Sequence, residues 1–199
     1  MIIDYTSKYG ARVVPDVNDN TGNDIVLPKF SQELLNEIID HNELELIDTV
    51  QMEDNFVKYL YKSNKFKETK VIVIKRGNEL KKLEFNGRFF LSTFVKLDIP
   101  KGFDFDIRNR SGNFKRNINV IMGLIDNPYT GFMGLQLKPH YGFAEIKLDG
   151  ETAISQIKTN IVYPNREFNR LAPSEFEKKK TVIIKKQKRG AKGFGSTGK

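Results

Sequence analysis

Arg189-Gly190-Ala191-Lys192-Gly193-Phe194-Gly195-Ser196-Thr197-Gly198-Lys199, the last stretch of the 199-residue chain, is its most informative segment. Glycine amides can approach an anion closely, so a Gly-Ser-Thr-Gly run can wrap a phosphate group. Arg189 adds a planar guanidinium, which suits phosphate oxygens, and Phe194 can stack on a base. The pattern predicts a segment that closes over a nucleotide; a glycine-rich terminus without a ligand is the alternative.

The segment resembles the fifth sequence motif of the trimeric deoxyuridine triphosphatases (dUTPases), and every fixed position of that motif matches. Stretches similar to the other four motifs occur upstream in family order. They lie at 21–25, 110–112, 123–131 and 153–157. The fourth keeps Gln156 but has Ala153 where the family usually has arginine.

The resemblance implies Mg²⁺-dependent hydrolysis of dUTP to dUMP and pyrophosphate, by attack of water on the α-phosphate. Asp126 matches the family's catalytic base, although an aspartate in such a sequence can also simply cap its turn. Asp24 matches the first-motif aspartate, with a role near the ion through water or in subunit contacts. The residues expected to bind phosphate are Arg110, Ser111, Gly112, Gln156, Arg189, Gly195, Ser196 and Thr197.

Base and sugar recognition is expected at Tyr129, with its ring against the deoxyribose, and at Phe194, stacked on the base. Backbone groups of a hairpin, including Gly123 and Gly134, are expected to pair with the uracil edge. No protein side chain is expected to bind the metal directly, because phosphates and water hold it. The resemblance also implies a homotrimer whose three sites lie between subunits.

The fold class expected is all-β, a distorted jelly roll with a small α+β insert. We assign 1–29 and 86–177 to the dUTPase-like core, 30–85 to the insert, and 178–199 to a basic linker and nucleotide-binding arm. The insert is expected because 87 positions separate Asp24 from Ser111, many more than the family usually has. It is either a structural elaboration or a docking surface for another protein.

Local patterns predict short strands at 71–74, 89–91, 94–97, 118–121 and 181–184, where β-branched and aromatic residues cluster between turn residues. A hairpin turn is predicted at 76–78. Ser31 is a candidate cap, and apolar residues at helical spacing predict one short helix over 32–40.

The net charge of +8 is concentrated at one end of the chain. Residues 178–199 carry +9, so the rest of the chain carries −1. The basic segment either steers a triphosphate or forms a solvated face, and no specific nucleic-acid binding is expected. The chain has no cysteine, which argues against thiolate metal sites. No apolar run suits a membrane helix, and a cytoplasmic location is expected.

Three alternatives to a dUTPase stay open at this stage. The first is a triphosphate pyrophosphatase with altered base preference, because 120–122 replaces smaller residues of the family. The second is a related deoxycytidine triphosphate deaminase, disfavoured because Gln136 stands where those enzymes use glutamate. The third is a regulatory protein, since some phage members of the family carry inserts that engage repressors.

Overall fold

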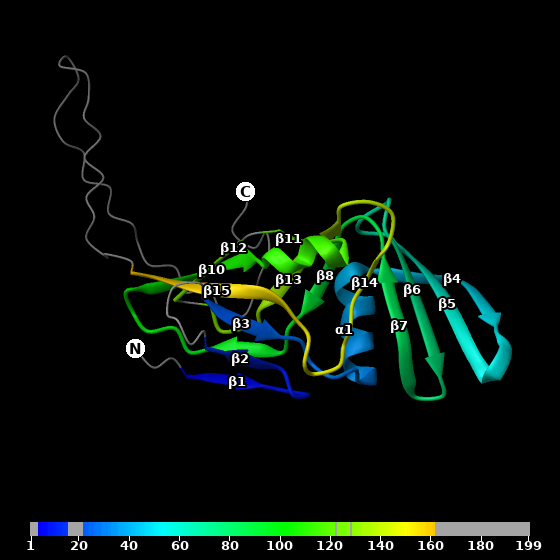
Figure 1. Cartoon of the computed structure of the whole chain (residues 1–199), viewed down its shortest axis with the longest axis horizontal. Coiled ribbons are helices and arrows are strands. Elements are labelled where there is room, and N and C mark those ends of the chain that lie inside the picture. Colours follow the sequence, from blue (N-terminus) through cyan, green and yellow to red (C-terminus); the bar gives the residue numbers. More distant parts are fainter. Residues whose placement is uncertain (1–3, 16–21, 122, 128, 162–199) are drawn as a thin grey trace, which may run out of the picture.

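The computed structural model describes residues 4–15, 22–121, 123–127 and 129–161. These residues form mostly strands, with one α-helix and two short 3₁₀ helices (Figure 1). The elements are β1 (Tyr5–Ser7), β2 (Arg12–Val14), β3 (Asn23–Val26), α1 (Gln32–Asn42), β4 (Leu44–Gln51), η1 (Glu53–Asn55), β5 (Phe56–Ser63), β6 (Lys70–Arg76), β7 (Glu79–Phe85), β8 (Phe89–Ser92), β9 (Val95–Leu97), β10 (Phe103–Asn109), η2 (Ser111–Arg116), β11 (Ile118–Ile121), β12 (Gly123–Asp126), β13 (Gly134–Pro139), β14 (Ala144–Glu145) and β15 (Ala153–Ile161).

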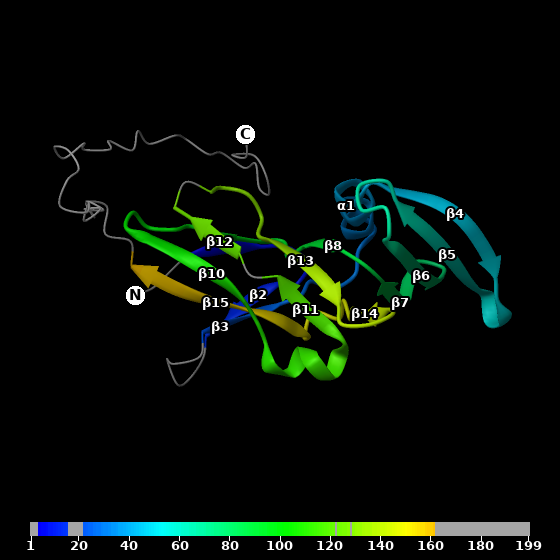
Figure 2. The same cartoon turned by 90° about the horizontal axis from the view of Figure 1, so that it is seen from above.

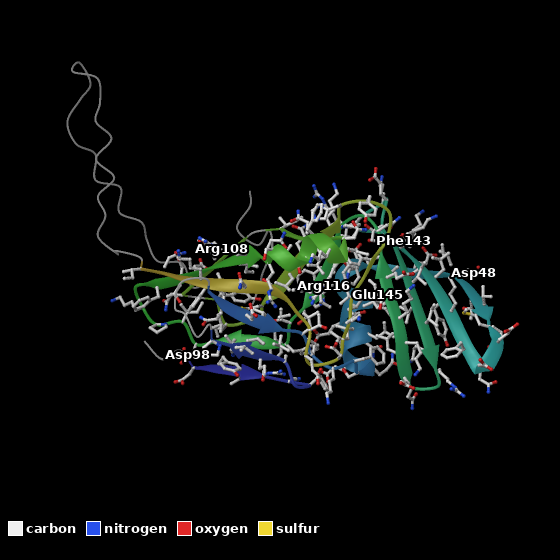
Figure 3. All side chains as sticks on the ribbon, in the orientation of Figure 1. Asp48, Asp98, Arg108, Arg116, Phe143 and Glu145 are labelled. Carbon is white, nitrogen blue, oxygen red and sulfur yellow. The ribbon has the colours of Figure 1, made fainter. Side chains whose placement is uncertain are left out.

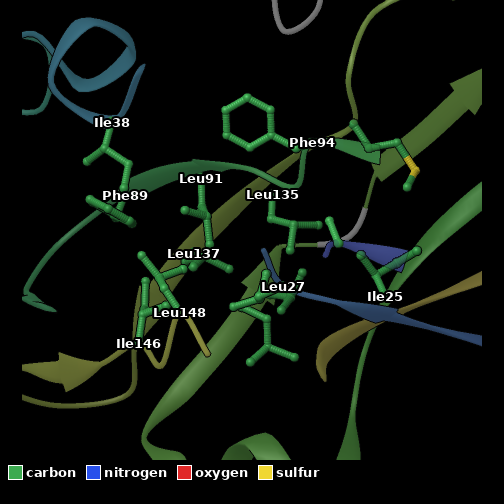
Figure 4. Close-up of a cluster of buried hydrophobic side chains, with 14 of the residues drawn as sticks. Ile25, Leu27, Ile38, Phe89, Leu91, Phe94, Leu135, Leu137, Ile146 and Leu148 are labelled. Carbon is green, nitrogen blue, oxygen red and sulfur yellow. The ribbon is translucent and has the colours of Figure 1, made fainter. Parts of the chain in front are cut away.

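Three antiparallel sheets make up one half of the described molecule. Their strand orders are β12-β10-β15-β3-β2, β11-β13-β8 and β1-β9. Figure 2 shows β12, β10, β15 and β3 side by side, so β3, from early in the chain, shares a sheet with β15, the last described strand. Their inward side chains form a buried core in which Ile25, Leu27, Leu91 and Leu135 meet (Figure 4). Burial of such side chains is the main source of the fold's stability.

A separate five-stranded sheet, in the order β14-β7-β6-β5-β4, makes up the other half (Figure 1). Strands β4 to β7 follow one another in sequence as an antiparallel meander. The short strand β14 comes from much later in the chain and pairs with β7. The sheet built from 44–85 is therefore completed by two residues from outside the predicted insert.

Helix α1 connects the two halves, packing against β8 on one side and β4 on the other. It begins where Ser31 Oγ accepts a hydrogen bond from the backbone N–H of Leu34, at 3.0 Å. Its buried residue Asn42 donates to the carbonyl of Phe90 at 2.8 Å and accepts from the N–H of Phe90 at 2.7 Å. Because the Asn42 side chain is buried, this pairing satisfies its amide and fixes the end of the helix against β8.

The predicted local elements are largely confirmed. The structure has strands over 71–74, 89–91 and 118–121, a turn at 77–78 and a helix over 32–42. The predicted strand 181–184 lies outside the described residues. No helix among the described residues has both the length and the apolar character that crossing a membrane requires.

The predicted strand 94–97 is wrong at its first residue. Phe94 has a φ of 53°, in the left-handed region that a bulky residue seldom adopts, and β9 begins only at Val95. The buried Phe94 ring contacts Tyr9 edge-on, with centroids 5.4 Å apart. Burying that ring compensates the backbone cost, which a pattern of local propensities does not reveal.

Candidate active site

Three neighbouring strands bring together residues from the first, second and fourth sequence motifs. In the β3–β15 pairing Asp24 lies opposite Gln156, and in the β15–β10 pairing Gln156 lies opposite Arg108. Arg110 follows directly after β10. Gly22, just before β3, has a φ of 101°, and a Cβ there would lie 2.9 Å from the carbonyl oxygen of Ile157. Only glycine therefore allows β3 to approach β15 this closely.

Asp24, Arg110 and Gln156 form a hydrogen-bonded cluster, which we call the Asp24 cluster. Arg110 Nη2 lies 3.1 Å from Asp24 Oδ2, and Gln156 Nε2 lies 3.1 Å from Asp24 Oδ1. The side chains of Arg110 and Asp24 are 33% and 26% exposed, so the ion pair is only partly screened by water. Both carboxylate oxygens are engaged, which orients the arginine and the amide.

The short helix η2, which carries Ser111 and Gly112, is attached to the start of β15 by side chains. Arg110 Nη1 and Arg116 Nη1 both donate to the carbonyl oxygen of Ala153, at 3.1 and 2.9 Å. Asn113 Nδ2 donates to the next carbonyl, that of Ile154, at 2.5 Å. Ser111 and Gly112 are exposed, so their hydroxyl and backbone groups are accessible to a ligand beside the Asp24 cluster.

Asp126 and Tyr129 lie on a turn at the end of β12. The N–H of Tyr129 donates to the carbonyl of Asp126 at 2.9 Å, which closes the turn. Tyr129 Oη donates to the carbonyl of Phe132 at 2.6 Å, and this bond fixes the direction of the ring. Both side chains are half-buried.

Within one chain, Asp126 is far from the Asp24 cluster. Asp126 pairs with Asp104 near the start of β10, whereas Arg110 follows the other end of the same strand. Six residues at about 3.4 Å each separate the two positions by roughly 20 Å. The structure thus divides the predicted site residues into two groups on one sheet.

The predicted hairpin around Tyr129 is wrong in its pairing. A turn is present, but β12 pairs with β10 while β13 pairs with β11 and β8. The segment after β12 therefore connects two sheets. Gly134 lies buried on β13 opposite Ser92. Gly123 lies opposite Ile107 and lines an open groove of about 470 Å³ together with residues 106–109 of β10.

The remaining predicted site residues are Arg189, Phe194, Gly195, Ser196 and Thr197, and they lie outside the described residues. Two residues that the sequence did not single out, Asn113 and Arg116, hold η2 in place. Arg116 is a cation a few positions after the second motif, but the sequence does not set it apart from the neighbouring Lys115.

The described residues contain no group of three or more histidine, aspartate or glutamate side chains placed to hold a metal ion. Each carboxylate oxygen of Asp24 already accepts one bond, from Arg110 or from Gln156, so an ion at Asp24 would share these oxygens with two donors. The cluster is arranged as a donor-rich surface for an anion, with Arg110 and Gln156 held in place by the carboxylate.

No protein-family model matches the sequence. Among solved structures, the chain resembles a dUTPase from phage phi11 of S. aureus at 13% identity, a TM-score of 0.50, and coverage of 88% of this chain and 100% of that one. A dUTPase of Staphylococcus bacteriophage 80alpha matches at 14% identity and a TM-score of 0.47, over 98% of both chains. The EIAV dUTPase matches at 13% identity and a TM-score of 0.45, over 82% of this chain and 92% of that one.

The likeness to the phi11 protein covers all of that chain and most of this one, so it concerns the overall fold. It agrees with the all-β architecture described above and with the jelly roll expected from the motifs. This chain therefore has the dUTPase fold.

Proposed function

We propose that this protein hydrolyses dUTP to dUMP and pyrophosphate. The observation that carries the proposal is the Asp24 cluster, which unites residues from three motifs up to 132 positions apart in sequence. A chance resemblance in short motifs gives no reason for these side chains to contact one another. The dUTPase fold supports the same conclusion.

The chemistry requires a nucleophilic water, donors for the phosphate oxygens, and in-line geometry. Arg110, Ser111, Gly112 and Gln156 donate hydrogen bonds to the phosphates. Asp126 accepts a proton from water as the water oxygen bonds to the α-phosphorus. The bond from that phosphorus to the bridging oxygen breaks, and the electron pair leaves with pyrophosphate.

The site is completed between subunits of a homotrimer. Support comes from the roughly 20 Å along β10 between the position of Asp126 and that of Arg110, which no side chain spans. The Asp24 cluster of one subunit then faces the Asp126 turn of a neighbour. The arm containing Arg189, Gly195, Ser196 and Thr197 closes over the phosphates.

Base and sugar selection is assigned to the Asp126 turn and to the arm. Tyr129, whose hydroxyl is fixed by Phe132, presents its ring to the deoxyribose and leaves no space for a 2′-hydroxyl. Backbone groups at Gly123, which lines the open groove along β10, read the uracil edge, and Phe194 stacks on the base. Recognition through such an edge rejects a base with the wrong donor pattern by a factor of roughly 10⁴ or more.

Mg²⁺ is the cofactor expected, held mainly by the phosphates and water. A study of the phi11 enzyme describes the coordination of a structural Mg(II) ion in that protein. When bound here, the ion neutralises charge on the triphosphate. Asp24 would contact it through water, accepting at a lone pair that Arg110 and Gln156 leave open.

The test is release of pyrophosphate by the purified full chain with Mg²⁺, compared across dUTP, dCTP and dTTP. We expect turnover of dUTP only. Turnover of dTTP as well would indicate a broader pyrophosphatase, and conversion of dCTP to dUTP with release of ammonia would indicate a deaminase. Absence of turnover with every triphosphate would refute the proposal.

A second candidate function, docking of a regulatory protein through the insert, is favoured by the exposed edge of its sheet. Strand β4 pairs only with β5, so its other edge is unpaired among the described residues. Leu46, Ile47, Val50 and Met52 are each between 43% and 49% exposed on and just after this strand. The acids Glu45, Asp48, Glu53 and Asp54 accompany them.

This acidic and apolar edge suits an extended segment with alternating lysine and apolar residues, added as a further strand. The probe is an eight-residue peptide of alternating lysine and valine, followed by fluorescence anisotropy. We expect binding that Asp48→Lys weakens and no binding of a matched glutamate–valine peptide. Self-association of the chain through β4, detected as a mass above that of a trimer, would assign the edge to a second copy instead.

A further inference from the structure

Arg116 is a cation without an acidic partner among the described residues. It ends η2, is exposed as a residue, and donates from Nη1 to the carbonyl oxygen of Ala153. No carboxylate in the described part of the chain forms an ion pair with it, in contrast to Arg110, which pairs with Asp24. Figure 3 shows Arg116 among the side chains beside the start of β15.

Arg116 and Arg110 are held close together although both are positively charged. They donate to the same oxygen atom, at 2.9 and 3.1 Å, so their Nη1 nitrogens are at most about 6 Å apart. In the part of the chain that the structure describes, Asp24 is the only carboxylate bonded to the pair, and it bonds Arg110. Two guanidiniums and one carboxylate leave an excess positive charge at this position, which an anion would neutralise.

The carbonyl of Ala153 fixes the direction of both side chains. A guanidinium carries five N–H donors, and the described residues accept one hydrogen bond from Arg116. Its remaining donors are available to a ligand lying beside Ser111 and Gly112, at the other end of the same short helix. The planar fork of arginine matches two oxygens of one phosphate group.

We propose that Arg116 is a second phosphate-binding arginine, which together with Arg110 binds neighbouring phosphate groups of a nucleoside triphosphate. The proposal rests on the proposed function for the identity of the nucleotide. Binding of the phosphate groups by the two arginines does not depend on the base. The proposal also explains how the fourth motif can have Ala153 where the family usually has arginine. The alanine leaves β15 without a cationic side chain at that position, and its carbonyl instead supports a cation supplied by η2.

The experiment measures binding of inorganic tripolyphosphate, with Mg²⁺, to the full-length chain by isothermal titration calorimetry. Arg116→Gln is expected to raise the Kd by about 10- to 100-fold, the range for loss of charge-assisted hydrogen bonds. Arg116→Lys keeps the charge but loses the fork, so an intermediate Kd is expected. Two controls, Arg76→Gln on β6 and Lys115→Gln on η2, remove the same charge and should change the Kd less than about twofold.

Melting temperatures separate this role from a structural one, because Arg116 also supports η2. If Arg116→Gln unfolds the chain, the Kd for tripolyphosphate and its salt dependence are measured on Arg116→Lys instead. A Kd equal to that of wild type would then overturn the inference. Normal tripolyphosphate binding by folded Arg116→Gln, alongside clear loss in Arg110→Gln, would overturn the inference even if dUTP is hydrolysed. Loss of tripolyphosphate binding in Arg116→Gln, in a chain that hydrolyses no triphosphate, would support the inference while refuting the proposed function.

Discussion

Asp24 and Gln156 face each other across β3 and β15, with Gln156 Nε2 3.1 Å from Asp24 Oδ1. The pair joins the beginning and the end of the described chain and lies beside Arg110, which bonds the other oxygen of Asp24. A glutamine is required here for a definite reason. Its amide can donate to the carboxylate and present a further N–H to an anion, which glutamate cannot do.

Gln156→Glu should therefore damage both stability and activity. The substitution preserves shape but places two carboxylates in contact, so we expect a loss of about 1–3 kcal/mol in the free energy of unfolding. The loss should shrink as the pH falls toward 4, because protonation of one carboxylate restores a donor. Thermal unfolding across pH and dUTP turnover measure the two effects. Gln51→Glu, at the exposed end of β4, is the matched control and should behave as wild type.

Asp126→Asn should lower kcat by about 10³-fold while leaving triphosphate binding intact, because an amide cannot accept the proton of water. Single-turnover kinetics with dUTP and a binding measurement with a non-hydrolysable analogue separate the two quantities. Asp48→Asn, on β4, removes the same charge and should retain full activity. A rate for Asp126→Asn within tenfold of wild type would exclude Asp126 as the base and favour a role in capping its turn.

Local sequence patterns predicted the elements whose causes are local. The helix over 32–42 follows from the Ser31 cap and an apolar stripe, and the strand over 70–76 from its β-branched residues. Pairing between distant segments is not encoded locally. The addition of β14 to the insert sheet and the separation of β12 from β13 depend on contacts that no local pattern contains.

The candidate site was likewise predictable from the sequence only in part. The resemblance selected Asp24, Arg110 and Gln156 as separate motif residues, and the structure brings them into contact. Arg116 was not selected, because lysines and arginines on short exposed helices are common and only the shared Ala153 carbonyl distinguishes this one. The residues assigned to the arm, including Phe194, remain predictions because they lie outside the described residues.

Asp149 should contribute stability that is lost in acid. Partial burial acts to raise the pKa of Asp149, but hydrogen bonds from Glu151 and Thr152 outweigh it and hold the pKa below the ordinary value of 3.8. The stabilisation is therefore present above about pH 4 and disappears as the pH falls through the lower, folded-state pKa. Asp149→Asn should lower the melting temperature at pH 7, with a difference from wild type that diminishes in acid. Glu151→Gln, a neighbouring acid, is the control and should show no such convergence.

A chain ending at Lys188 should keep its β core and lose most of its catalysis. The truncation removes Arg189 and Phe194, the residues assigned to the phosphates and the base, but no residue of the buried core described here. Phe194→Ala alone should weaken binding of a dUTP analogue by about 1–3 kcal/mol, as for aromatic stacking in nucleic-acid binders. Melting temperature and dUTP hydrolysis are measured together. Normal melting with a near wild-type rate would mean that the arm does not cover the substrate.

Mixing two inactive variants should restore activity if each site is shared between subunits. Arg110→Gln removes a phosphate-binding residue, and Asp126→Asn removes the catalytic base. A homotrimer of either variant alone should therefore be inactive. When the two chains are refolded together in equal amounts, about one interface in four pairs an intact Arg110 with an intact Asp126 from its neighbour, which predicts roughly a quarter of wild-type activity. Light scattering verifies the trimer, and mixing without unfolding is the control. The roughly 20 Å between the two positions within one chain is the physical reason for this expectation. Trimers that stay inactive after mixing would place both residues in the same subunit's site and contradict the shared arrangement.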